Sequence, residues 1–473
     1  MGENMNEEAL TADGQKDDDI DYVEDREELT EERIKDMLDA REYKELKEEL
    51  ETNMYPVDLA EILEEFDQKH MVLVFRLLAK EEAAETFSYM NSDMREDLIN
   101  ALTDSELEEI MEEMYLDDTV DVLEEMPANV VDRLLMVTDA EKRQQINQLL
   151  QYPEDSAGSV MNVDYIALRR EMTVADSILK IRQVGLNRET IYTCYVTEQR
   201  HLIGQVDIKE LLTSSESKTV EEIMDTNMLY ARTTDDQEDV ANIITKYGLI
   251  ALPIVDHENC MVGIVTVDDA MQVLQDETTE DISIMAGVNP NEDSYFGTSI
   301  FEHVKSRIPW LLFLMLSATV TQMIMNSYEN ALALMPQLAG FVPMLTGTGG
   351  NCGSQSSTLV IRGLAVGEIE FSDLFKVIWK EIRIAFCISI ILSVVNGIRI
   401  MLMGQGDAMM AFTIGLTMAC TVLIAKVVGC TLPLIAKKIG LDPAIMATPL
   451  ISTLVDISTI SVYFAIVSYV FRL

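Results

Sequence analysis

Residues 444–464 read AIMATPLISTLVDISTISVYF, and this stretch decides how the rest of the chain is interpreted. It is apolar and long enough to cross a bilayer, for which a helix needs ~20 residues. It also carries a carboxylate, Asp456, near its middle, where a charged group costs ~2.5–3.5 kcal/mol even on a lenient insertion scale. Such residues usually face a bundle interior or an aqueous path. The stretch therefore predicts a membrane helix that borders an ion pathway.

Helical periodicity groups other polar side chains with this carboxylate. Because each residue of an α-helix turns ~100°, one side of the helix collects Asp456 and three hydroxyl residues, Thr448, Ser452 and Thr459. The remaining sides carry Leu, Ile, Val and Tyr. This pattern is typical of a pore-lining helix. The alternative is a structural Asp456 paired with a basic residue of a neighbouring helix, for which Lys426 is the plausible internal partner.

The formal charge of −47 is distributed unevenly along the 473 residues. Residues 306–473 carry 10 basic and 8 acidic side chains, so residues 1–305 carry the other 25 basic and 74 acidic ones. A nucleic-acid-binding protein needs a basic face, so this acidity argues against nucleic acid as a partner. It fits a role in binding cations.

The first 28 residues are predicted to be a disordered acidic tail. Because they are acidic and polar, neither a cleavable signal sequence nor a myristoylation signal is expected in them. The six cysteines form no CxxC pair, so they predict buried thiols, not a disulfide framework or a zinc site. No two of the four histidines have metal-ligand spacing, and no serine or cysteine lies beside a histidine that could activate it as a base, so an enzyme is not expected.

An acidic all-α domain is predicted over residues 29–152. Apolar residues recur three and four apart in short phrases, and two helix starts carry capping boxes, Thr103 with Glu106 and Thr138 with Glu141. The next part, residues 153–276, alternates short β-rich runs with helical ones and repeats itself, which predicts an α/β tandem with halves at 153–217 and 218–276. The second half contains GLIALPIVDHENCMVGIVTVDDAM from Gly248 to Met271, which resembles a CBS domain, and the first half resembles a more diverged CBS domain.

A connecting helix is predicted over residues 277–305, and a polytopic helical membrane domain over residues 306–473. Five spans are expected, at about 309–327, 332–361, 384–403, 409–430 and 445–470. Basic residues gather in the loops after the second and fourth spans, so the positive-inside rule places the N-terminal domains in the cytoplasm and the C-terminus outside. The second span includes GTGGNCGSQSST, residues 347–358. Such backbone is tolerated where it packs closely on another helix or lines a cavity, and both alternatives stand.

Taken together, these motifs resemble the MgtE family of magnesium channels. The resemblance covers about residue 30 to the end and rests on the order of the domains and on quoted motifs. These motifs are PEDSAGSVM (153–161), GTGGNCGSQS, IRGLAVGEI and GLDPAIMATPLISTLVDISTISVYF. It implies a homodimer in the inner membrane, with a pore on its two-fold axis lined by the last span.

The resemblance also implies roles for individual residues. Asp456 would be the selectivity carboxylate for Mg²⁺, with Ser452 and Thr448 as pore-lining neighbours. Intracellular Mg²⁺ would be sensed by acids matching the family's regulatory positions: Glu85, Asp117, Asp121, Asp269, Glu280, Asp281 and Asp442. Thr266 and Asp269, a hydroxyl and a carboxylate three apart at a helix start, have the chemistry to hold the ribose and phosphate of ATP.

The function expected is therefore a Mg²⁺-selective uptake channel that closes when cytoplasmic Mg²⁺ binds between the acidic helical domain and the CBS pair. Two alternatives remain open at this stage. One is an exchanger that couples Mg²⁺ to another cation. The other is a membrane-anchored CBS nucleotide sensor without transport.

Overall fold

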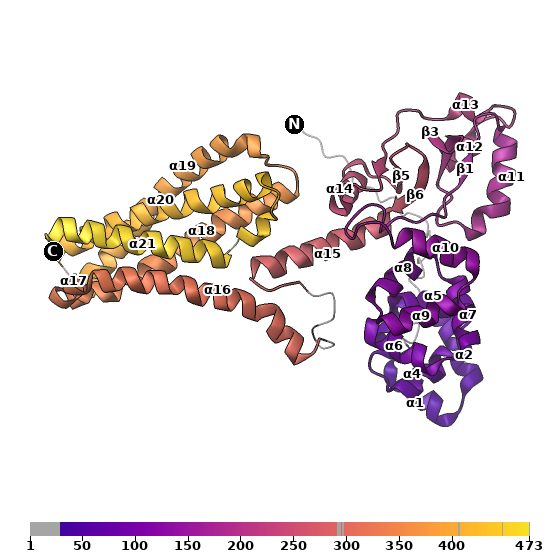
Figure 1. The fold of residues 1–473 in the computed structure, drawn as a ribbon, viewed down its shortest axis with the longest axis horizontal. Helices are drawn as coiled ribbons and strands as arrows, with labels where there is room; N and C mark the ends of the chain where they lie inside the picture. The colour runs from indigo at the N-terminus through magenta and orange to yellow at the C-terminus, as the bar shows by residue number, and fades with distance from the viewer. Residues whose placement is uncertain (1–28, 291–294, 296–297, 405–406, 447, 473) are drawn as a thin grey trace, which may run out of the picture. The chain divides into compact units, whose positions relative to one another are not determined.

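The computed structural model describes residues 29–290, 295, 298–404, 407–446 and 448–472 (Figure 1). The chain divides into two compact units, residues 1–147 and 148–473. The predicted acidic tail, residues 1–28, lies outside the described residues.

The first unit is a stack of short helices, as predicted, drawn in indigo to purple in Figure 1. Fully buried leucines, such as Leu46, Leu63, Leu98 and Leu134, form its core. The helices of its described part are α1 (Glu31–Ala40), α2 (Tyr43–Asn53), α3 (Pro56–Leu63), α4 (Gln68–Phe75), α5 (Lys80–Tyr89), α6 (Ser92–Ala101), α7 (Asp104–Glu113), α8 (Leu116–Glu125), α9 (Ala128–Val137) and α10 (Ala140–Leu149), the last of which crosses into the second unit.

The first predicted capping box is confirmed at the start of α7. Thr103 Oγ1 accepts the Glu106 N–H at 3.3 Å, and Glu106 Oε2 accepts the Thr103 N–H at 2.7 Å. Two of the four N–H groups that a helix start leaves unpaired are thereby satisfied.

The second predicted capping box is wrong. Thr138 Oγ1 donates to the Leu134 carbonyl at 2.7 Å, so this side chain serves the end of α9. Asp139 Oδ2 instead accepts the N–H groups of Glu141 and Lys142, at 3.2 and 3.0 Å. Aspartate is itself a strong N-cap residue, and here it stands one position closer to the helix.

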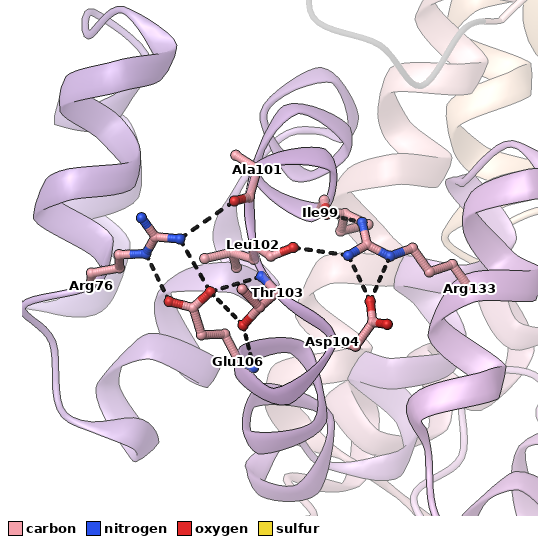
Figure 2. Close-up of polar contacts among 8 residues, drawn as sticks. All are labelled: Arg76, Ile99, Ala101, Leu102, Thr103, Asp104, Glu106 and Arg133. Atoms are coloured by element: carbon pink, nitrogen blue, oxygen red, sulfur yellow. Dashed lines mark hydrogen bonds and ion pairs between the residues drawn. The ribbon is translucent and has the colours of Figure 1, made fainter.

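Two arginines, Arg76 just after α4 and Arg133 of α9, bind the connection between α6 and α7 (Figure 2). Arg76 Nε donates to Glu106 at 2.7 Å, and Arg133 Nη2 donates to Asp104 at 2.8 Å. Carbonyls at a helix C-terminus lack intrahelical partners and attract cations. Each guanidinium accordingly also donates to the end of α6: Arg76 to the Ala101 carbonyl, and Arg133 to the carbonyls of Ile99 and Leu102.

The second unit begins with two three-stranded sheets of the same topology, which confirms the predicted tandem. In each sheet the first two strands are parallel and the last two antiparallel, with a register shift at the matching place. The strands are β1 (Ala167–Leu168), β2 (Thr193–Glu198), β3 (His201–Asp207), β4 (Ala231–Arg232), β5 (Ala251–Val255) and β6 (Met261–Thr266). The helices that pack with them are α11 (Val174–Val184), α12 (Ile208–Thr213), α13 (Val220–Ile223) and α14 (Gln237–Tyr247), with the 3₁₀ turn η1 (Gly185–Asn187).

The connection to the membrane part consists of two helices. α15 (Val267–Met285) follows β6 directly and ends at a turn in which Gly287 has a φ of +73°. α16 (Ile300–Ser327) starts at a capping box of Ser299 and Glu302. The predicted connecting stretch 277–305 thus contains the end of one helix and the start of another, and residues 291–294, 296 and 297 within it lie outside the described residues.

The membrane part is a bundle of long helices, drawn in orange and yellow in Figure 1. Four described stretches are long and apolar enough to cross a membrane: 300–327, 371–402, 408–438 and 443–471. The elements after α16 are α17 (Glu329–Leu334), η2 (Pro336–Phe341), α18 (Val342–Ala365), η3 (Phe371–Asp373), α19 (Leu374–Leu402), α20 (Ala408–Lys438), η4 (Pro443–Met446) and α21 (Thr448–Phe471).

The prediction of five spans is not confirmed, because α18 lacks the apolar composition of the other four helices. With 24 residues it is ~36 Å long, which is a sufficient length. Its small residues are used for packing: a Cβ on Gly429 of α20 would lie 2.3 Å from the Gly353 carbonyl oxygen, and a Cβ on Gly353 would lie 2.6 Å from Ile451 of α21. Close helix packing, one of the two expectations for the glycine-rich run, is therefore what these contacts show.

Candidate ion pathway and acidic cluster

Asp456 lies midway along α21 and is partly exposed. Among the described residues it has no ion pair and no hydrogen bond within the chain. The fully buried residues Ile451, Val455, Tyr463 and Phe464 fix which side of α21 faces the bundle. A carboxylate in a membrane helix needs solvation or a partner. Asp456 therefore has the surroundings of a group that meets water or an ion.

The hydroxyl residues of α21 differ in their surroundings. Ser452 faces Gly350 of α18, since a Cβ on that glycine would lie 3.2 Å from Ser452 Oγ. Thr459 is only 1% exposed and packs against Gly349, so it lies inside the bundle and not beside an open path. Thr448 is the first residue of the helix, and its side chain lies outside the described part.

Lys426 of α20, considered as a structural partner for Asp456, pairs with another acid. Its Nζ lies 3.6 Å from Oε2 of Glu381 on α19, and the two side chains are only 4% and 9% exposed. Ser356 of α18 donates to the same Glu381 oxygen at 2.5 Å. One acid, one base and one hydroxyl thus meet between three helices.

The sequence did not predict Glu381 as a buried membrane residue, because the expected third span began at residue 384. The helix in fact starts at Leu374, so Glu381 falls one to two turns inside it. The available signal was that Glu381 is the one acid among the residues of α19, in a helix otherwise rich in Ile, Val and basic residues.

A cluster of acidic residues lies where α15 meets η4, within the second unit. The two elements are in contact, and Asp442, just before η4, accepts the Ala444 N–H at 2.7 Å. Asp281 and Glu280 of α15 interact electrostatically with Asp442. Three of the predicted regulatory acids are therefore neighbours in space although about 160 residues separate them in the sequence.

Burial and mutual repulsion change the proton affinity of this cluster. Burial raises the pKa of Asp281 to about 6, and the negative charges of Asp442 and Glu277 add to the shift. Burial likewise raises the pKa of Glu238, on α14, to about 7, with Glu277, Asp236 and Asp281 as further causes. Glu238 and Glu277 were not among the predicted site residues. Gln237 donates to Glu277 at 2.9 Å.

The cluster is not a preformed metal cage. Within the described part of the chain, no group of three or more His, Cys, Asp or Glu side chains is arranged to hold a metal ion. Mg²⁺ usually keeps several waters and uses one or two carboxylates. Close acids with raised pKa values therefore suit a hydrated dication, which relieves their repulsion without replacing every water.

The other predicted regulatory acids belong to different elements. Glu85 is exposed on α5, and Asp117 and Asp121 lie one turn apart on α8. Burial lowers the pKa of Arg95, and the charges of Glu125, Asp121 and Asp118 oppose that shift. The negative charge of Asp121 thus stabilises the charged form of Arg95 within the first unit. Asp269 lies on α15, in the second unit.

The predicted nucleotide-contacting pair forms a helix cap. Thr266 Oγ1 donates to Asp269 Oδ2 at 2.6 Å, and the Thr266 N–H donates to the same carboxylate at 3.2 Å. Burial raises the pKa of Asp269. Both polar groups are engaged with each other at the start of α15, so a nucleotide would have to share or replace these hydrogen bonds.

The fold and these two sites define a class: a multi-pass membrane protein in which a helical acidic domain and a CBS pair precede the membrane helices. Comparisons with known proteins agree. Residues 342–466 match MgtE, described as a divalent cation transporter; residues 54–155 match the MgtE intracellular N domain; residues 220–276 match the CBS domain.

Two relatives are similar over nearly their whole length. The chain is 34% identical to the magnesium transporter MgtE of Thermus thermophilus, covering 90% of this chain and 95% of that protein. It is 31% identical to the magnesium transporter MgtE of Bacillus subtilis, covering 87% of this chain and 91% of that protein. The chain therefore belongs to the MgtE family of magnesium transporters.

Solved structures also match the N-terminal half. The cytosolic domain of the Mg²⁺ channel MgtE in complex with ATP is 34% identical and covers 51% of this chain and 99% of that chain, with a TM-score of 0.49. The soluble part of a magnesium transporter is 26% identical and covers 52% of this chain and 97% of that chain, also with a TM-score of 0.49.

Proposed function

We propose that the protein is a Mg²⁺-selective channel for magnesium uptake that cytoplasmic Mg²⁺ closes. One observation carries the transport part: Asp456 lies in the middle of a membrane helix without a partner among the described residues, because Lys426 is occupied by Glu381. A second copy of the chain, related by a two-fold axis along α21, would bring two such carboxylates together. Thr448 and Ser452 complete the proposed pore-lining set.

A pair of Asp456 side chains suits a hydrated divalent ion. Mg²⁺ dehydrates reluctantly, so a carboxylate constriction can select by charge and by fit to the hydrated ion without stripping its water. A homodimer in the inner membrane fits this arrangement. Its N-terminal domains would lie in the cytoplasm and its C-terminus outside, because basic residues gather at the helix ends on that side. These residues are Arg362 at the end of α18, Lys376 and Lys380 at the start of α19, and Lys437 and Lys438 at the end of α20.

The gating part of the proposal rests on the excess of acid. Without cations, the net charge of about −49 on residues 1–305 makes the cytoplasmic parts repel one another. Bound Mg²⁺ would bridge acids and favour the compact state, which offers more ligands, and so shift the population towards a closed channel. The proposed ligands are Glu85, Asp117, Asp121, Asp269, Glu280, Asp281 and Asp442, joined by Glu238 and Glu277 of the acidic cluster.

The CBS pair is proposed to bind ATP, as the cytosolic domain of a solved MgtE does. Thr266 and Asp269 are the candidate contacts in this chain. Their mutual hydrogen bonds predict weak binding, because the nucleotide has to compete with an existing helix cap. Calorimetric titration of the full chain with ATP, with and without Thr266→Val, measures this directly.

An exchanger that couples Mg²⁺ to another cation is the second candidate, since the structure adds Glu381 to the ionisable groups buried in the membrane part. The two functions differ in driving force. A channel carries a current that follows the Mg²⁺ gradient alone, whereas an exchanger stops when the counter-ion is removed.

The proposal is tested by rescue of a bacterium that lacks Mg²⁺ uptake. We expect wild type and Asp407→Asn to restore growth at low external Mg²⁺, and Asp456→Asn to fail at equal amounts in the membrane. Asp407 is a suitable control because it caps the start of α20, and asparagine caps equally well. Growth restored by Asp456→Asn would refute the transport role of this carboxylate, and failure of wild type to restore growth would favour a sensor without transport.

A further inference from the structure

The buried pair of Glu381 and Lys426 has no role in the pathway described above. Both side chains lie within membrane helices and are almost fully enclosed, at 9% and 4% exposure. Taking two charges out of water is costly, and apolar residues of similar size often do as well for stability. A charged pair at this place therefore calls for an explanation other than stability.

The position of the pair offers one. Ser356, which donates to Glu381, belongs to α18, while Glu381 and Lys426 belong to α19 and α20. The next residue, Ser357, donates at 3.1 Å to the carbonyl of Met446, the last residue of η4, just before α21. Two consecutive serines thus tie α18 to the ion pair on one side and to the inner end of the pore helix on the other.

The same helix also sets the position of the pore-facing side chains. Gly350 of α18 lies against Ser452, and Gly349 lies against Val455 and Thr459, on either side of Asp456 in α21. These contacts are close, since a Cβ on Gly349 would lie only 2.8 Å from Val455 Cγ1, so α18 packs directly against the part of α21 that carries Asp456. A displacement of α18 would therefore move Ser452 and Asp456.

We propose that Glu381, Lys426 and Ser356 are positioning residues that fix α18 behind the pore helix and thereby determine which divalent ion passes Asp456. An ion pair that shares a hydroxyl is directional and has one favourable geometry, whereas contacts between apolar side chains are not directional and allow helices to shift. The trio therefore sets the axial and rotational position of α18. This inference rests on the proposed function, because it assumes that ions pass Asp456.

The experiment measures Mg²⁺ and Co²⁺ flux into proteoliposomes that contain equal amounts of the full chain. Ser356→Ala removes only the hydrogen bond that ties α18 to the pair, and Ser389→Ala is its control. Ser389 is also a buried serine, but its hydroxyl donates within α19, to the Phe386 carbonyl. We expect Ser356→Ala to change the Mg²⁺/Co²⁺ flux ratio by about fivefold, the size of coupling between contacting residues, and Ser389→Ala to leave the ratio unchanged.

Two single variants and the corresponding double variant separate positioning from folding. Glu381→Gln and Lys426→Gln each leave one buried charge unpaired and should lower the amount of inserted protein, whereas the double variant removes both charges and should restore insertion. The ratio should remain altered in the double variant. A wild-type ratio in Ser356→Ala, or in an inserted double variant, would overturn the inference.

The outcome is distinguishable from a failure of the proposed function. If Asp456→Asn conducts Mg²⁺ as wild type does, ions do not pass this residue and the proposed function fails. If Asp456→Asn is silent while Ser356→Ala keeps the wild-type ratio, only the positioning role is lost.

Discussion

A titratable side chain inside a membrane is informative because something has to compensate its charge. In this chain the charges of Glu381 and Asp456, which lie well inside membrane helices, are compensated in different ways. Glu381 has a lysine and a serine hydroxyl, whereas Asp456 has neither among the described residues. A shortage of protein partners is what a residue that holds a transported cation requires, since a fixed lysine would compete with the ion.

The raised pKa values of the acidic cluster predict a pH dependence of stability. Glu238 has a pKa of about 7 in the folded chain, against 4.5 for an ordinary glutamate, and Asp281 one of about 6 against 3.8. A folded state that holds a proton more tightly than the unfolded state gains stability below the unfolded pKa and loses it as pH rises through the folded one. Metal-free protein should therefore lose stability between about pH 4 and pH 7 at these sites.

The prediction is tested with Glu238→Gln, which keeps the shape of the side chain and removes the titration. The midpoint of thermal unfolding of the metal-free full chain should fall less between pH 5.5 and pH 7.5 in this variant than in wild type. Saturating Mg²⁺ should abolish the difference by neutralising the cluster. An identical pH profile for the two proteins without Mg²⁺ would contradict the assignment.

At the scale of elements, the membrane helices depend on close approach. Gly429 and Gly353 bring α20 and α18 together so that a Cβ on Gly429 would lie 2.3 Å from a backbone oxygen. We expect Gly429→Ala to destabilise the membrane part by ~1–3 kcal/mol, the usual cost of overpacking, and to abolish Mg²⁺ flux. Gly397→Ala is the control, because nothing lies within 4 Å of its added Cβ. Equal flux for both variants would show that the helices do not need this contact.

The short helices of the first unit depend instead on basic side chains that bind helix ends. Arg133→Met removes donors from the carbonyls of Ile99 and Leu102. We expect a loss of ~1 kcal/mol, or roughly fivefold faster amide hydrogen exchange in α6 and α7. Lys44→Met should leave this exchange unchanged, since Lys44 is 91% exposed. Unchanged exchange in Arg133→Met would assign the stability of this joint to apolar packing alone.

The helices and strands show most clearly which parts of the structure the sequence could predict. Periodicity predicted the stack of short helices, the duplicated α/β unit and the helix around Asp456, because each has a strong repeating pattern. It failed where two local signals competed, as at Thr138 and Asp139, and it was not confirmed where composition and length disagreed, as in α18. Glu381 was missed because an acid near a span boundary looks like a loop residue until its buried partner on another helix is known.

For the whole molecule, the uneven distribution of charge predicts a response to divalent cations. The membrane part is nearly neutral, while residues 1–305 carry about −49. Small-angle scattering of the full chain in detergent should show a smaller radius of gyration as Mg²⁺ rises from micromolar to tens of millimolar. An equal ionic strength of Na⁺ should have much less effect, because monovalent ions screen charges without bridging them. Equal compaction by both salts would reduce the effect to screening.

The central claim is that Mg²⁺ crosses the membrane past Asp456, and flux through purified protein tests it most directly. Proteoliposomes with wild type, Asp407→Asn or Asp456→Asn are given an inward Mg²⁺ gradient and an internal Mg²⁺ indicator. We expect rapid Mg²⁺ influx for the first two, without any coupled counter-ion, and at least tenfold less for Asp456→Asn, given what one carboxylate contributes at a pore constriction. Wild-type influx through Asp456→Asn would contradict it.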